Sequence, residues 1–334
     1  METTYLTRNF NYWSKRGING PKPLPIVGTY LYQFKTPRPH LSLQWQEKYG
    51  KIYGVYNGNA PLLVVAEPEL IKQICVKDFN IFTDRNRNQR NHPILSRHLV
   101  AENGDDWKRI RSIVTPTFSS NKMKKMYPMI RRCLEDFINE LEVYAKDRKE
   151  IDIKPMYGKY TMDVISTCAF ATKTNTYKDP NDPFVLNAQK VFQTSVKRLL
   201  PLLLFPKFVL KLLNITHAAE ESVNEFFFNI TRRIMKERKN SHKKYNDFIE
   251  LLMNAQKDST NNNPKEDEND VNEAHHVNEG KEEKEVEKKI LSNVDKYITE
   301  EEILAQSWVF FVAGYETTAT TLTFASYELA LNQD

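Results

Sequence analysis

Apolar residues recur at helical spacing along most of this chain, and at strand spacing in one stretch near its start. Between Lys51 and Ala66 two apolar runs, KIYGVY and PLLVVA, flank Asn57-Gly58-Asn59. Asparagine and glycine between such runs favour a tight turn, so the sequence predicts a β-hairpin. Further along, apolar residues return every three to four positions, which predicts helices over residues 68–77, 106–116, 121–149, 154–171, 183–200 and 218–255. The expected fold class is mainly α with a small N-terminal β-hairpin.

Residues 258–290 interrupt this pattern. The segment is rich in charged residues, poor in apolar residues and free of aromatic residues. Because it cannot bury enough apolar surface to offset the entropy of ordering, we expect a solvated, disordered loop. Helical patterns on both sides of the loop indicate that it lies inside one domain that covers residues 1–334.

The final helix is marked by its first turn. Thr299 stands three residues before Glu302, so each side chain can accept the backbone N–H of the other in a capping box. From there no proline interrupts the helical pattern, which continues to about Leu331. We expect a long helix that passes through the centre of the protein.

The bulk composition limits the function classes. Hydrophobic residues make up 40% and charged residues 27% of the 334 residues, as in globular proteins. The formal net charge of +5 is small and the basic residues are dispersed, so no nucleic acid partner is expected. No apolar run reaches the ~20 residues that a membrane span needs, and residues 1–16 are too polar for a signal peptide. Three scattered cysteines without metal-ligand spacing indicate a reducing compartment.

Unusual residues concentrate inside the final helix, where a bulky apolar run ends at Ala313 and Gly314. A glycine inside a helix costs about 1 kcal/mol relative to alanine, and the carboxylate of Glu316 needs a partner if it is buried. The Thr317 hydroxyl, four residues after Ala313, can hydrogen-bond to the Ala313 carbonyl. The pattern predicts a small polar-lined groove for a small ligand, in which Glu316 and Thr317 pass protons.

A plain core helix with an incidental glycine is the alternative interpretation of this string. It would explain an isolated glycine or threonine. We favour a functional site because several local rules fail together within one or two helical turns, and such clusters mark functional sites.

A second candidate site is the pair Trp107 and Arg111. The two residues are four positions apart, so an indole N–H and a guanidinium lie on one helical face, and both groups are donors only. Such a pair suits carboxylates that arrive from outside the helix. Half-buried packing with a surface salt bridge is the alternative.

Further strings accompany these two sites along almost the entire chain. They are the lead-in GPKPLPIVG, the hairpin, FTDR at 82–85, GDDWKRIRSIVTPTFSSNKMKKM at 104–126, MDVISTCAF at 162–170, NDPF at 181–184, AGYETT at 313–318 and YELALNQD at 327–334. In this order they resemble the cytochrome P-450 superfamily, and more narrowly its microsomal family-3-like drug-metabolising members. AGYETT and Trp107-x-x-x-Arg111 are the specific motifs.

The resemblance implies a heme-thiolate monooxygenase. Arg85, Trp107 and Arg111 would bind the propionates of heme b. Ala313 and Gly314 would lie over the distal face of the heme.

The resemblance also implies catalytic and substrate-binding residues. Thr317 and Glu316 would be the alcohol and the acid that deliver protons to dioxygen. Leu99, Val309 and Val312 would line a pocket for small lipophilic substrates. Val312 stands where relatives often carry a larger aromatic residue, so the size of the pocket differs from theirs.

The resemblance implies partners as well. Electrons would come from NADPH through a separate flavoprotein reductase, for which the candidate contacts are basic residues near the second site: Lys108, Arg109, Lys122, Lys124 and Lys125. A solvated basic face is the alternative interpretation of these residues.

A membrane surface is the other implied partner. The protein would lie on the cytosolic face of the endoplasmic reticulum membrane, with the usual N-terminal anchor missing from this chain. The apolar stretch at 199–213 would dip into one leaflet, and a core helix pair with a proline bend is the alternative.

Two family motifs do not occur in this sequence: a helix with Glu-x-x-Arg, and the loop that presents the axial cysteine thiolate. Cys75, Cys133 and Cys168 lie in helical segments without such a loop and are expected to be small buried residues. We therefore expect a cytochrome P-450 fold truncated after its long central oxygen-activating helix, and no activity from this chain by itself. A non-catalytic membrane-associated helical fragment or pseudoenzyme is the alternative, and a soluble carrier of an apolar ligand explains Trp107 and Arg111 less well.

Overall fold

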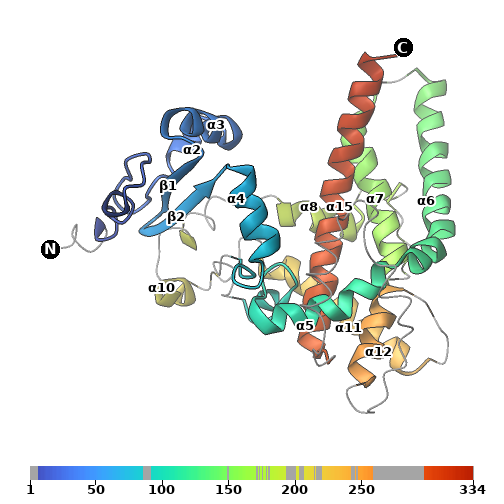
Figure 1. Cartoon of the computed structure of the whole chain (residues 1–334). Coiled ribbons are helices and arrows are strands. Elements are labelled where there is room, and N and C mark those ends of the chain that lie inside the picture. Colours follow the sequence, from blue (N-terminus) through green and yellow to red (C-terminus); the bar gives the residue numbers. More distant parts are fainter. Residues whose placement is uncertain are drawn as a thin grey trace. The chain divides into compact units, whose positions relative to one another are not determined.

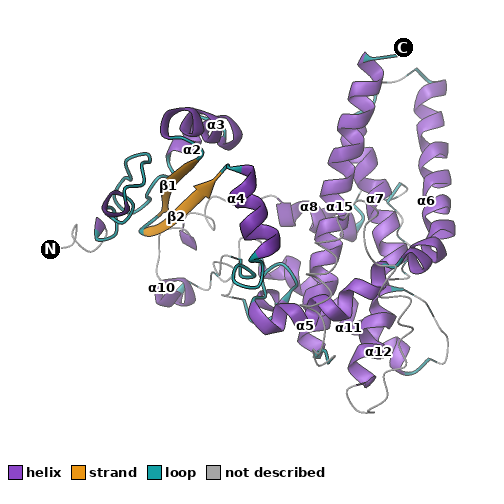
Figure 2. Ribbon diagram, in the orientation of Figure 1, coloured by secondary structure: helices purple, strands orange, loops and turns teal. Residues whose placement is uncertain are grey.

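The computed structural model describes most of the chain as two compact units. The described residues are 7–85, 92–148, 150–170, 172, 174, 176–177, 179, 181–192, 201–202, 207–213, 215, 220–241, 245, 247–258 and 297–333. The first unit comprises residues 1–83 and 196–216, and the second comprises residues 84–195 and 217–334. Helices dominate and one β-hairpin is present among these residues, so the expected fold class is confirmed (Figure 2).

The first unit contains the expected hairpin. Strands β1 (Ile52–Asn57) and β2 (Ala60–Val65) are antiparallel, and Asn57 pairs with Ala60 across a two-residue turn. Gly58 in this turn has a φ of 57°, a conformation that favours glycine. The ring of Trp13 occupies the space that a side chain at position 54 would need, so Gly54 allows the indole to lie directly on β1.

The described part of the first unit also contains η1 (Ser14–Arg16), α2 (Tyr32–Lys35), α3 (Arg38–Tyr49), α4 (Pro68–Lys72) and α10 (Lys207–Leu212). A π-helical turn, Gln73–Lys77, continues α4 and completes the helix expected there. Helix α3 was not expected. Its only buried residue is Leu41, so it has no apolar face that periodicity could reveal.

The second unit is a helical assembly around α15 (Glu300–Leu331). Helix α7 (Ile153–Phe170) lies between α15 and α6 (Ser120–Lys146), as Figure 1 shows. The other helices in the described part of this unit are η4 (Leu95–Arg97), α5 (Gly104–Val114), η5 (Thr115–Phe118), α8 (Pro183–Phe192), α11 (Glu221–Lys239) and α12 (Phe248–Asp258).

The expected helix over residues 218–255 is wrong as a single segment, because α11 ends at Lys239 and α12 begins at Phe248. The Asp247 carboxylate accepts hydrogen bonds from the Arg238 guanidinium at the end of α11 and from the Glu250 N–H in the first turn of α12. The apolar pattern alone does not distinguish two such helices from one. The second part of the helix expected at 183–200 and nearly all of the loop expected at 258–290 lie outside the described residues.

Among the described residues, no helix combines the length and the apolar character that crossing a membrane requires.

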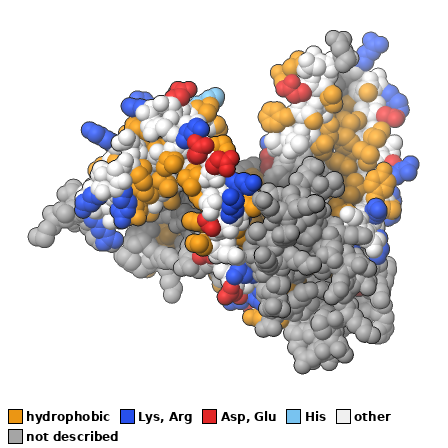
Figure 3. All heavy atoms as spheres, viewed as in Figure 1, with side chains coloured by type: hydrophobic (Ala, Val, Ile, Leu, Met, Phe, Trp, Pro, Cys, Tyr) orange, Lys and Arg blue, Asp and Glu red, His pale blue; other side chains and the backbone are white. Residues whose placement is uncertain are grey.

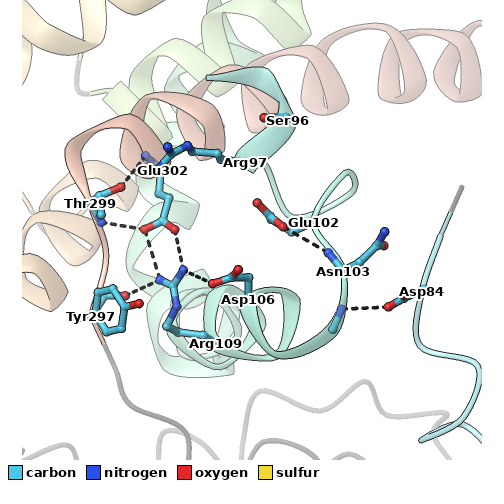
Figure 4. Close-up of a pocket in the computed structure, with 11 residues that line it drawn as sticks. Asp84, Ser96, Arg97, Glu102, Asn103, Asp106, Arg109, Tyr297, Thr299 and Glu302 are labelled. Atoms are coloured by element: carbon cyan, nitrogen blue, oxygen red, sulfur yellow. Dashed lines mark hydrogen bonds and ion pairs between the residues drawn. The ribbon is translucent and has the colours of Figure 1, made fainter. Parts of the chain in front are cut away.

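A buried ion pair fixes the start of α15. The expected capping box is confirmed, since Glu302 Oε2 accepts the Thr299 N–H at 2.7 Å and Thr299 Oγ1 accepts the Glu302 N–H at 3.3 Å. The same carboxylate accepts two hydrogen bonds from the Arg109 guanidinium on α5, at 2.6 and 3.2 Å (Figure 4). Arg109 also donates to Asp106 at 2.8 Å and to the Tyr297 carbonyl at 2.7 Å. One carboxylate therefore caps α15 and joins it to α5.

Breaking this pair is expected to destabilise the fold strongly. Arg109 and Glu302 are 5% and 4% exposed, so Arg109→Ala would leave a buried carboxylate without its cation. We expect a loss of about 3–5 kcal/mol in the free energy of unfolding, measured by urea denaturation. The matched control is Arg131→Ala, which removes an exposed ion pair to Glu135 and should cost less than ~1 kcal/mol. Equal losses in the two variants would contradict a special role for the buried pair.

The same pair predicts a pH dependence of stability. Burial by itself raises the pKa of Glu302, but hydrogen bonds from Arg109 and Thr299 outweigh it and hold the pKa below its ordinary value. A carboxyl with a depressed pKa in the folded state stabilises the fold above its unfolded pKa of about 4.3, and this stability is lost as the pH falls through the folded pKa. The difference in unfolding free energy between wild type and Glu302→Gln should therefore be largest near neutral pH and shrink below about pH 4. Glu301→Gln, at the exposed neighbouring position, is the control, and a difference that grows on acidification would contradict the assignment.

Candidate active site

Helix α15 changes character along its length. Residues 302–308 are buried on all sides, whereas from Phe311 onward the buried positions fall on one face that includes Tyr315 and Ala319. Ala313 and Thr317 lie on an exposed face. Figure 3 shows hydrophobic side chains gathered on the upper part of the region that α15 and α6 form. Exposed apolar residues of the two helices include Phe324, Tyr327, Leu329 and Leu331 of α15 and Tyr127, Ile138 and Val143 of α6.

The expected hydrogen bond of Thr317 is confirmed. Its Oγ1 donates to the Ala313 carbonyl oxygen at 2.6 Å. The same contact recurs one turn later, where the Thr321 hydroxyl donates to the Thr317 carbonyl at 2.9 Å. Such bonds compete with the helical bonds of the same carbonyls and bend helices slightly. Thr317 therefore presents a hydroxyl oxygen whose proton is directed along the helix and whose lone pairs face outward.

Glu316 pairs with a residue that the sequence analysis did not identify. Its Oε1 lies 2.7 Å from the Lys154 ammonium at the start of α7 and accepts from the Thr320 hydroxyl at 3.4 Å. The carboxylate is partly buried and the lysine is exposed. Lys154 lies in the first turn of α7, and the local sequence carries no signal for this contact, because it depends on how α7 and α15 pack.

Gly314 brings α15 close to α7. A Cβ at this position would stand 3.0 Å from Ile165 Cδ1 and 3.3 Å from Cγ1, closer than side chains normally approach. Nearby, the Thr161 hydroxyl on α7 donates to the Tyr315 carbonyl at 3.1 Å. The position of the missing side chain is therefore filled by α7. The role of Gly314 in cofactor binding stays a prediction.

Asn103 connects the expected propionate-binding residues. Its side chain accepts the Arg85 N–H at 2.9 Å and donates to the Arg85 carbonyl at 3.1 Å, and it directly precedes α5. The helix then carries Trp107 and Arg111 four residues apart, both half-buried. The backbone of Arg85 is thus held at the helix that carries the other two donors. Sequence reasoning did not identify Asn103, although an asparagine before a helix is a recognised capping signal.

The three expected pocket residues pack against one hydrophobic core. Leu99, Val309 and Val312 are all partly buried, and all contact the cluster that includes Trp308 and Phe311. Gln306, three residues before Val309, holds the backbone around Leu99 by hydrogen bonds to Leu99 and Arg97. Gln306 was also missed, and its signal is an amide inside an otherwise apolar helical run.

A polar cavity of about 690 Å³ opens at the starts of α5 and α15 (Figure 4). It is lined by Arg97, Asn103, Gly104, Ser96, Tyr297 and Thr299, by the ion pair of Arg109 and Glu302, and by Asp84, Glu102 and Asp106. Leu99, Val309 and Val312 do not line it. With four carboxylates and two guanidiniums in its wall, the cavity does not suit a lipophilic substrate.

The three cysteines differ in exposure. Cys133 and Cys168 are buried in α6 and α7 as expected, whereas Cys75 is exposed. Burial, reinforced by the nearby Cys133, raises the pKa of Cys168 to about 11, so it is a thiol at neutral pH. No group of three histidine, cysteine or acidic residues in the described part of the chain could hold a metal ion.

One of the basic residues expected to contact a redox partner does not lie on the surface. The prediction that Arg109 contacts a redox partner is wrong, because its side chain is buried against Glu302. Lys124 and Lys125 are exposed on α6, and Lys108 forms an ion pair with Asp105 at 3.1 Å.

Comparison with known proteins identifies the class. The family model for Cytochrome P450 matches residues 18–280 and 281–334. The chain therefore belongs to the cytochrome P450 family, as its motifs indicated.

Similar curated proteins narrow the resemblance. The chain is 35% identical to Cytochrome P450 3A11 of Mus musculus over 99% of its own length, 33% identical to Cytochrome P450 3A56 of Fundulus heteroclitus over 97%, and 34% identical to Cytochrome P450 3A2 of Rattus norvegicus over 98%. It spans about 60% of the length of these relatives.

The contact between Gly314 and Ile165 predicts the effect of added bulk on α15. We expect Gly314→Val to lower the free energy of unfolding by about 1–3 kcal/mol, because its branches must enter the space of Ile165. Because Ile165→Ala by itself also removes packing, the double variant Gly314→Val/Ile165→Ala should lose less than the sum of the losses of the two single variants. Ala325→Val, on the exposed part of the same helix, controls for a β-branched side chain in α15 and should cost less than ~1 kcal/mol. Thermal or urea unfolding measures the wild type and the four variants, and additive losses in the double variant would contradict the contact.

Proposed function

We propose that the protein of this chain is an NADPH-dependent heme monooxygenase that oxidises small lipophilic substrates. Family membership along almost the whole chain supports the class. The observation that carries the proposal is the exposed face of α15, where Ala313 leaves space and the Thr317 hydroxyl is fixed by its bond to the Ala313 carbonyl.

The donors present fit one part of the cofactor. Arg85, Trp107 and Arg111 offer only hydrogen-bond donors, and the propionates of heme b offer only acceptors at neutral pH. The small side chain of Ala313 fits a flat macrocycle on the exposed face of α15. The cysteines described above do not provide the axial thiolate. When bound, the heme iron supplies the activation of dioxygen.

The residues of α15 would manage protons in the reaction. The Thr317 hydroxyl donates to the Ala313 carbonyl and can accept a hydrogen bond from water at Oγ1. The Glu316 carboxylate is held by Lys154 and can exchange a proton with solvent, because it is partly exposed. A proton taken up at Glu316 can then pass through ordered water to Thr317 Oγ1 and reach the reacting oxygen.

The remaining roles are proposed from the family resemblance. Leu99, Val309 and Val312 would form one wall of the substrate pocket, where apolar contacts favour lipophilic substrates. Electrons would come from NADPH through a flavoprotein reductase, and the exposed Lys124 and Lys125 are contacts that fit an acidic partner surface. We place the protein at the cytosolic face of the endoplasmic reticulum membrane, with residues 199–213 against the membrane surface.

The proton-delivery role predicts the behaviour of Thr317→Ala. In the heme-loaded protein this variant should keep its heme but form at least about tenfold less product per NADPH consumed and more hydrogen peroxide, since a positioned proton donor contributes about 10²–10⁴-fold. The matched control is Thr321→Ala, which removes the same type of bond to a helix carbonyl one turn away and should keep its coupling. Unchanged coupling in Thr317→Ala would contradict the role. A wild-type protein that takes up no heme and consumes no NADPH would favour the non-catalytic alternative.

A further inference from the structure

Gln306 uses both atoms of its amide to hold a distant loop. Its side chain is fully buried on α15. Its Oε1 accepts the Leu99 N–H at 2.8 Å, and its Nε2 donates to the Arg97 carbonyl at 2.9 Å. Figure 4 shows Arg97 beside the first turns of α15. Both partners are backbone atoms, so the contact fixes the path of the chain and does not depend on which side chains stand at positions 97 and 99.

The loop held by Gln306 already contains two fixed turns. His92 Nδ1 accepts the N–H groups of Ile94 and Leu95, at 3.1 and 3.0 Å. His98 Nδ1 accepts the N–H groups of Val100 and Ala101, both at 3.2 Å. The imidazoles thus supply acceptors inside the loop for backbone N–H groups.

Other contacts attach the ends of this loop to the helices. His92 Nε2 lies 2.9 Å from Glu221 at the start of α11, and the ring of His98 stacks on Trp308 of α15 with centroids 5.9 Å apart. Next to the attachment at His98, the amide of Gln306 binds the backbone of Arg97 and Leu99 and so helps to set its position relative to α15. The loop cannot slide along the helix without breaking both hydrogen bonds of this buried amide at once.

This contact lies next to the proposed substrate pocket. Gln306 stands three residues before Val309, and such residues are neighbours on a helix surface. Leu99 and Val309 pack against the same hydrophobic core. A shift of the Leu99 backbone would therefore move one wall of the pocket relative to Val309 and Val312.

We propose that Gln306 is a positioning residue for substrate specificity, which acts through the backbone of Leu99 and sets the size of the substrate that the pocket accepts. The inference rests on the proposed function and deepens it. An amide is required because the site presents one donor and one acceptor. A carboxylate at position 306 would keep an acceptor for the Leu99 N–H but place its other oxygen, also an acceptor, against the Arg97 carbonyl, and an apolar side chain would leave both backbone groups unpaired.

The contact itself can be tested without catalysis. In Gln306→Met, amide hydrogen exchange of residues 92–103 should become at least about tenfold faster, while exchange in the interface of α7 and α15 stays unchanged. Gln306→Glu keeps an acceptor for Leu99 and should give a smaller increase. The matched control is Ser307→Ala, because Ser307 is equally buried and its hydroxyl has no hydrogen-bond partner in the described structure. Unchanged exchange in Gln306→Met would overturn the proposal. If that variant does not fold, Gln306→Glu decides by the same measurement.

The role in specificity is tested in the heme-loaded protein. The experiment compares kcat/KM for a large and a small lipophilic substrate of one chemical series. Gln306→Met should change the ratio of these two values by about tenfold, which corresponds to a change of ~1.4 kcal/mol in the difference between the two activation free energies. The effect should largely disappear when Leu99→Ala is already present, since Gln306 acts through Leu99.

The outcomes separate the two proposals. A wild-type protein without oxidation of either substrate contradicts the proposed function, and the exchange experiment still tests the contact. Faster exchange with an unchanged substrate ratio, or an undiminished effect of Gln306→Met in the Leu99→Ala background, overturns the role in specificity while leaving the proposed function intact.

Discussion

The pair of Arg109 and Glu302 is the interaction on which the second unit depends. Two charges are removed from water there, and their separation of 2.6 Å, together with the bonds to Asp106, Tyr297 and Thr299, satisfies them. A buried charge without such partners is costly, so α5 and α15 have little freedom to move apart at this point. Because the ion pair joins α5 to α15, it helps to position Trp107 and Arg111 on α5 and the middle of α15.

The proposed site is carried by the part of α15 where full burial ends. Up to Trp308 the helix is surrounded by other elements, and beyond it one face contacts α7 while the opposite face is open. Gly314 and Glu316 serve the contact with α7, through Ile165 and Lys154. Ala313 and Thr317 lie on the open face. A single motif therefore combines residues that fix the helix and residues available to a ligand, which explains why its composition departs from that of an ordinary core helix.

The sequence predicts contacts that are local and misses those that depend on packing. The capping box of Thr299 and the hydroxyl bond of Thr317 follow from separations of three and four residues, and both are found. Glu302 was assigned to the cap alone, because nothing local indicates that Arg109, 193 residues away, also binds it. Likewise the glycine at 314 was explained by a groove, whereas its nearest neighbour is Ile165 of another helix. The short polar helix α3 was missed because it buries too little to leave a periodic signal.

The loop around Leu99 takes its final position from a residue far along the chain. Gln306 and Leu99 are separated by 207 positions, and such distant pairings form slowly because a long stretch of chain must first be closed. During synthesis, residues 92–103 leave the ribosome long before α15 exists. The two histidine-capped turns can form at once, whereas the register of the loop on the helix is set only when α15 has been made. Until then the apolar surface of the loop stays open to chaperones and to other unfinished chains.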